Sequence, residues 1–144
     1  LTIICYIFAR KLLVNNKKSS IMKKILINKR DEMVVVYLDN LAYLLADGSY
    51  TKIVYIGGMQ TTLAIGISDM EKIITNAFTK KPSPFIRLGR SLILNQSFLY
   101  SINLLKHRIT LSDTTKNILH LELPKPLLKK YKNMLVQKPA NIQE

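Results

Sequence analysis

Short apolar runs separated by two-residue turns fill the chain from residue 32 to residue 65. The runs are Met33 to Leu38, Leu41 to Ala46, Ser49 to Ile56 and Met59 to Ile65. The pairs between them are Asp39-Asn40, Asp47-Gly48 and Gly57-Gly58. Such pairs form tight turns, and Asp-Gly is a strong hairpin signal. Strands joined in this way predict an antiparallel meander and not alternating β-α units.

The next stretch changes to helical spacing. One apolar stripe is formed by Met70, Ile73, Ile74, Ala77 and Phe78. Ser68 and Glu71 have the spacing of a capping box, in which the serine accepts from first-turn amides and the glutamate reaches back. The polar face mixes both signs of charge, so we expect a helix that serves as scaffold. Prolines at 82 and 84 end it, because proline cannot continue a helix.

Residues 85–95, Phe-Ile-Arg-Leu-Gly-Arg-Ser-Leu-Ile-Leu-Asn, set Arg87 and Arg90 in an apolar run with Gly89 between them. Alternation of apolar and polar residues predicts a strand, and a glycine inside it indicates a bulge. Residues three apart point to opposite faces of a continuous strand, but a bulge at Gly89 returns both arginines to one side. Two interpretations follow: a guanidinium pair that faces a polyanion, or two solubilising arginines. Asn95 is expected to close the strand through its side chain.

The C-terminal part continues with strands and ends in a helix. Strands are expected at Phe98 to Leu105, Ile109 to Leu111 and Ile118 to Leu123. A short helical stripe follows, made of Leu127, Leu128, Tyr131, Met134 and Leu135. The predicted fold class is mainly β: antiparallel strands in a meander of small sheets, one capped helix between strands and a short C-terminal helix. The expected segments are a basic N-terminal extension (1–30), one domain (31–136) and a C-terminal tail (137–144).

Composition narrows the classes of function. The formal net charge of +13 over 144 residues points to nucleic acid or an anionic membrane as partner. A single cysteine, Cys5, excludes an internal disulfide and fits a reducing compartment. His107 and His120 have no cysteine or carboxylate cluster beside them, so neither a metal nor another cofactor is expected. The chain has no Gly-rich phosphate loop, no Ser-His-acid grouping and no paired carboxylates, and we do not expect an enzyme.

The basic residues fall into two regions. Residues 1–30 hold eight Lys/Arg and no acid, and residues 80–132 hold eleven against Asp113 and Glu122. The apolar residues 1–9 are too few to span a bilayer, which takes about 20. They are either the end of a membrane helix with a basic cytoplasmic flank or an upstream extension before Met22. In both cases we expect a mobile or loosely helical tract.

The motifs together resemble a known DNA-binding module. Leu-Ala-Asp-Gly-Ser-Tyr-Thr-Lys-Ile at 45–53, the helix that follows, the 85–95 stretch and the basic C-terminal end are similar to the LytTR domain of bacterial LytR/AlgR-type regulators. The resemblance covers residues 32–136. It implies a cytoplasmic transcription regulator, tethered to the membrane if residues 1–9 end a membrane helix. It also implies loops that enter successive major grooves of duplex DNA, and a dimer on paired repeat sites.

The resemblance also implies site residues by position. The family's Tyr-Thr-Lys-type segment falls on Tyr50, Thr51 and Lys52, and its His-Arg-Ser loop falls on Gly89, Arg90 and Ser91. Its C-terminal recognition segment falls near Pro126 and Leu127. Two departures matter: Gly89 stands where histidine is common, and Leu127 stands where arginine is common. Arg90 is then left to act alone in its loop, and base reading in the third segment passes to Lys125 or Lys129.

With this resemblance, the polyanion interpretation of the two arginines is favoured. Arginine can bond guanine O6 and N7 bidentately, whereas lysine acts mainly on phosphates. Arg90 is therefore the first choice for base reading and Thr51 the second. The expected backbone contacts are Lys52, Arg87, Ser91, Lys125, Lys129 and Lys130.

Two other classes of function stay open. One is a membrane-surface or membrane-anchored interaction module whose basic residues 1–30 bind anionic lipid. The other is an RNA-binding β-domain, which needs exposed aromatic side chains for stacking. Tyr50, Tyr55 and Tyr100 are the candidates for that role.

Overall fold

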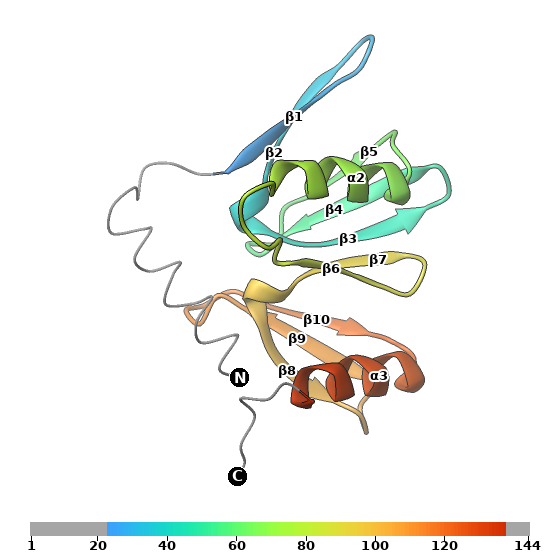
Figure 1. Cartoon of the computed structure of the whole chain (residues 1–144). Coiled ribbons are helices and arrows are strands. Elements are labelled where there is room, and N and C mark those ends of the chain that lie inside the picture. Colours follow the sequence, from blue (N-terminus) through green and yellow to red (C-terminus); the bar gives the residue numbers. More distant parts are fainter. Residues whose placement is uncertain (1–22, 138–144) are drawn as a thin grey trace.

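A computed structural model describes residues 23–137 of the chain (Figure 1). The elements in order are β1 (Lys24–Asn28), β2 (Met33–Tyr37), η1 (Leu38–Asn40), β3 (Leu41–Asp47), β4 (Tyr50–Tyr55), β5 (Gln60–Leu63), α2 (Ile67–Ala77), β6 (Phe85–Leu88), β7 (Leu92–Asn95), η2 (Gln96–Phe98), β8 (Leu99–Asn103), β9 (Arg108–Ser112), β10 (Ile118–Glu122) and α3 (Lys125–Val136). The strands form three antiparallel sheets, β1-β2, β5-β4-β3-β7-β6 and β10-β9-β8. The predicted class is confirmed: mainly β, with one helix in mid-chain and one at the C-terminal end.

The central five-stranded sheet is buried on both faces. α2 and the β1-β2 hairpin pack on one face, and β8 to β10 with α3 pack on the other (Figure 1). Successive side chains of β7 point to opposite faces of the sheet. Leu92 and Leu94 pack in the core with β8 to β10 and α3, and Ile93 packs in the core with α2 and the β1-β2 hairpin. Burial on both sides explains why β7 reads as a continuous apolar run.

The predicted antiparallel meander is confirmed for β3, β4 and β5, which pair in sequence order, with β3 and β4 joined at the Asp47-Gly48 turn. Asp47 pairs with Tyr50 across this turn. Gly48 has φ +63°, a left-handed conformation that glycine adopts without steric cost. The predicted meander is wrong for residues 33–40, because β2 pairs with β1 and not with β3, and the expected Asp39-Asn40 turn is part of η1.

The stretch 85–95 is a hairpin and not one bulged strand. Leu88 pairs with Leu92, which leaves Gly89, Arg90 and Ser91 as a three-residue loop. Gly89 has φ +69°, so the chain reverses at the position where the sequence pattern predicted a bulge. The prediction of a single strand is therefore wrong, and the glycine marks a turn.

Helix α2 has the predicted apolar stripe but not the predicted cap. Met70 and Ile74 are buried in the core. The helix begins at Ile67, its N-cap is Gly66, and the cap makes no side-chain hydrogen bond. The predicted capping box is wrong because Ser68 lies inside the first turn, where its side chain is not at the cap position.

The N-terminal prediction is wrong for residues 24–28, which form strand β1 and not a loose helix. Ile27 of β1 pairs with Val34, and Ile27 and Val36 are buried. The strand is short and has lysines near both ends, so its alternation of buried and exposed positions is not evident from the sequence. The predictions for residues 1–22, as membrane-helix end or extension, and for residues 138–144 lie outside the described residues, and the domain boundaries stay predictions. No helix within residues 23–137 is long and apolar enough to cross a membrane.

Asn95 closes the hairpin as the sequence predicts. It is 2% exposed, its Nδ2 donates to the Leu41 carbonyl at 2.7 Å, and its Oδ1 accepts from the Ser97 amide at 2.9 Å. This side chain therefore links β7 to the start of β3 and caps η2 at the same time.

Replacing Asn95 with alanine should lower the free energy of unfolding by about 1–3 kcal/mol, because it leaves buried backbone groups unpaired. Urea denaturation measures this change. Asn76→Ala, on the exposed face of α2, is the matched control and should stay within about 0.5 kcal/mol. Equal effects of the two substitutions would contradict the structural role of Asn95.

Candidate functional site

Three loops meet at one end of the molecule. The β3-β4 turn, the β6-β7 loop and the connection from β10 into α3 lie together on the right of Figure 1. The Ala46 amide donates to the Ser91 carbonyl at 2.8 Å, which ties the β6-β7 loop to β3. A Cβ on Gly89 would lie 3.5 Å from Cδ2 of Leu127, so the same loop also touches the first turn of α3. We call this surface the loop edge.

A fourth turn joins the loop edge. The Leu123 amide donates to the His107 carbonyl at 3.0 Å, which brings the β8-β9 turn beside the connection into α3. Lys106 and His107 are exposed there. Sequence reasoning did not assign them to the site, although the basic run Lys106-His107-Arg108 is visible in the sequence. Only the pairing of β9 with β10 places this run at the loop edge.

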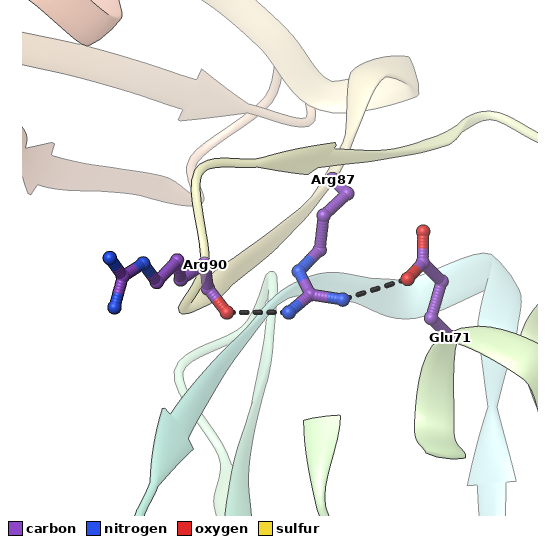
Figure 2. Close-up of polar contacts among 3 residues, drawn as sticks. All are labelled: Glu71, Arg87 and Arg90. Carbon is purple, nitrogen blue, oxygen red and sulfur yellow. Dashed lines mark hydrogen bonds and ion pairs between the residues drawn. The ribbon is translucent and has the colours of Figure 1, made fainter. Parts of the chain in front are cut away.

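Arg90 occupies the middle of the β6-β7 loop. It is exposed, and its side chain extends away from Arg87 and Glu71 (Figure 2). Its guanidinium makes no hydrogen bond or ion pair with another residue of the described part. Ser91, next to it, is also exposed.

Arg87 lies in β6, is half-buried, and makes its polar contacts within the protein. Its Nη1 is 2.7 Å from Oε1 of Glu71, and its Nη2 donates to the Arg90 carbonyl at 2.5 Å (Figure 2). Arg87 pairs with Ile93, whose side chain faces the α2 side of the sheet. Both terminal nitrogens of Arg87 thus have partners within the chain, and its assignment to the DNA backbone stays a prediction that these contacts do not support.

The predicted segment 50–52 divides between the two faces of β4. Thr51 is 0% exposed, and its Oγ1 donates to the Ile65 carbonyl at 2.6 Å. Its assignment as second base reader is corrected, since a buried hydroxyl with a partner cannot meet a groove. Tyr50 is 50% exposed, and Lys52, two residues on, is half-buried on the same face of the strand.

The three lysines predicted in the C-terminal segment are exposed on α3. Lys125 is its first residue, next to the connection at the loop edge. Lys129 and Lys130 line a shallow groove along the helix together with Pro126 and Asn133. The helix thus carries a basic surface that starts at the loop edge.

The three tyrosines expected to stack on RNA are not all exposed. Tyr55 is only 8% exposed, and its hydroxyl accepts from the Tyr37 amide at 3.3 Å. Burial raises the pKa of the Tyr55 hydroxyl above its ordinary value. Tyr50 and Tyr100 are exposed but belong to different sheets. The expected trio for RNA stacking is therefore incomplete.

Within residues 23–137, no three His, Cys, Asp or Glu side chains come close enough together to hold a metal ion. His120 instead faces Thr110 across the β9-β10 pair, with Nδ1 and Oγ1 3.0 Å apart. This histidine belongs to a cross-strand contact.

The comparisons with known proteins support the same fold. No protein-family model matches the chain, and no curated protein gives a significant match. Among solved structures, the chain is similar to the LytTr DNA-binding domain of a protein from Bacillus cereus, with a TM-score of 0.50 and 18% identity. The likeness covers 78% of this chain and 95% of that one. The chain therefore has a LytTR-like fold, as its sequence motifs predict.

Proposed function

We propose that this chain is the DNA-binding part of a transcription regulator and meets duplex DNA in the cytoplasm with its loop edge. The observation that carries the proposal is Arg90, an exposed arginine in the middle of a three-residue loop whose guanidinium has no partner among residues 23–137. The net charge of +13 supports a polyanionic partner. The LytTR-like fold supports DNA as that partner.

Arg90 has the chemistry to read a base. A guanidinium offers five N–H donors in a planar fork, which matches O6 and N7 of guanine in the major groove. None of these donors of Arg90 is used within residues 23–137, which supports their use in a contact with DNA. The short loop presents this side chain from a backbone fixed on both sides by paired strands.

The residues around Arg90 are suited to phosphates. Lys125, Lys129 and Lys130 are exposed on α3, and Ser91 adjoins Arg90. Lys52 is half-buried on the face of β4 that also carries Tyr50. Lysines and hydroxyls on phosphate oxygens fix the position of a protein on the duplex without reading sequence. The proposed division is therefore base reading by Arg90 and affinity from its neighbours. Two copies on paired repeat sites are proposed on the family resemblance alone.

The affinity of the chain for duplex DNA should fall steeply as salt rises. Each phosphate neutralised by a lysine releases counterions, which contributes about −0.9 to the slope of log K against log salt. A titration with a labelled duplex between low and physiological salt measures this slope. An affinity that stays flat would contradict phosphate contacts by the lysines.

Replacing Arg90 and replacing Lys129 with alanine should have different effects on DNA binding. Arg90→Ala should cost about 1–3 kcal/mol on the preferred site and relax the preference at one or two base pairs. Lys129→Ala should weaken all sequences about equally and reduce the salt slope by about one. Sequencing of selected DNA fragments, followed by competition binding, separates the two outcomes.

The control for this comparison is Lys72→Ala, which removes an exposed lysine from α2, a helix that is not one of the loops or turns of the loop edge. It should change neither the preference nor the melting temperature. Suppose that Arg90→Ala lowers the melting temperature by many degrees, or weakens preferred and random DNA equally. Then Arg90 does not read bases.

A further inference from the structure

A short chain of polar contacts joins helix α2 to the backbone of the loop that carries Arg90. Glu71 of α2 lies 2.7 Å from Nη1 of Arg87, and Nη2 of the same guanidinium donates to the Arg90 carbonyl at 2.5 Å (Figure 2). One planar group thus connects a helix carboxylate with a loop carbonyl. A charged donor makes these hydrogen bonds stronger than neutral ones.

The surroundings of Arg87 indicate that its contacts add little to the stability of the fold. Its side chain is 23% exposed, and its Nε is buried without a hydrogen-bond partner in the described part. Its ion pair with Glu71 is the only salt bridge within residues 23–137. A partly buried ion pair often adds no stability over apolar residues of similar volume, because both charges lose water. What the pair supplies instead is a fixed geometry.

The loop backbone is held at two consecutive carbonyls. Arg87 binds the carbonyl of Arg90, and the Ala46 amide binds the carbonyl of Ser91 at 2.8 Å. Because peptide units are planar, two fixed carbonyls set the orientation of the backbone between them. The Arg90 side chain then leaves the loop in a defined direction, away from both Glu71 and Arg87 (Figure 2).

We propose that Glu71 and Arg87 are positioning residues that hold the loop so that Arg90 meets its base in the required geometry. The inference rests on the proposed function. A contact group that is oriented before binding pays less ordering entropy on the DNA, and bidentate hydrogen bonds tolerate little misplacement. Loss of the pair should therefore reduce the advantage of the preferred site more than the affinity for random DNA.

The competing role for Arg87 is a direct contact with phosphate. The two roles give different results for Glu71→Gln, which removes the carboxylate and leaves the shape of the side chain. Glu71 is 44% exposed, so this substitution does not endanger the fold. A released phosphate-binding Arg87 would raise the affinity for preferred and random duplexes alike. A positioning pair lowers the ratio of the two affinities.

The test is a double-mutant cycle in the full chain with Arg87→Gln, Arg90→Ala and both together. The preferred duplex and a scrambled duplex of equal length are bound at one salt concentration. Arg87→Gln should lower the ratio of the two affinities about tenfold, within the range for one lost base contact. It should lower the ratio no further when Arg90 is already alanine, since there is then no side chain to position.

Two further variants exclude simpler explanations. Arg87→Lys keeps the charge beside Glu71 but not the fork that reaches two partners, so it should not restore the ratio. Lys72→Gln changes the charge next to Glu71 on α2 and should leave the ratio unchanged. Amide hydrogen exchange in the free protein should quicken at Arg90 and Ser91 in Arg87→Gln while the core strands stay protected.

The outcomes separate the two proposals. If Arg90→Ala itself leaves the ratio unchanged, base reading by Arg90 is overturned and the positioning role falls with it. If Arg90→Ala lowers the ratio but Arg87→Gln does not, the positioning role alone is overturned. The same holds if Arg87→Gln lowers the ratio equally with and without Arg90, or if Arg87→Lys restores it.

Discussion

Burial of the central sheet on both faces is the constraint on which the rest of the structure depends. Strand β7 sends Leu92 and Leu94 into one core cluster and Ile93 into the other. No face of β3 or β7 is therefore left for polar chemistry. Polar groups near these two strands are found where the chain leaves the sheet, because turns need no apolar side chains. The loop edge is this place: the β3-β4 turn, the β6-β7 loop and the start of α3 meet there (Figure 1).

This constraint places the two arginines of residues 85–95 in different environments. Arg87 is inside β6, so its guanidinium passes over the sheet toward α2 and needs an internal counter-charge, which Glu71 provides. Arg90 is in the loop, so its guanidinium stays in water. The charge of Arg87 is partly neutralised by a carboxylate at 2.7 Å, whereas the guanidinium of Arg90 has no carboxylate partner within residues 23–137. The position of each arginine relative to the end of the strand decides whether its guanidinium meets Glu71 or extends into solvent.

The sequence predicts those parts of the fold that depend on local chemistry. The turn pairs Asp47-Gly48 and Gly57-Gly58 predict the β3-β4 and β4-β5 hairpins, and helical spacing predicts the stripe of α2. The errors arise where tertiary contacts decide. The β6-β7 hairpin was missed because β7 is buried on both faces and shows no alternation to mark its limits. The inward orientation of Thr51 and the engagement of Arg87 depend on strand register and on the helix packed above, and neither can be read from spacing.

Glu71 shows why the sequence view of the site was incomplete. The mixed charges on the polar face of α2 indicated scaffold only, and Glu71 was expected to serve the helix cap. In the structure the cap is Gly66, and this leaves the carboxylate free to reach across to Arg87. The conformation of the loop around Arg90 therefore depends on residues from α2, β3 and β6 that are far apart in sequence. Transferring Gly89, Arg90 and Ser91 to another protein would move the side chain but not the contacts that orient it. The direction in which the Arg90 side chain leaves the loop is therefore set by the packed domain and not by the loop residues alone.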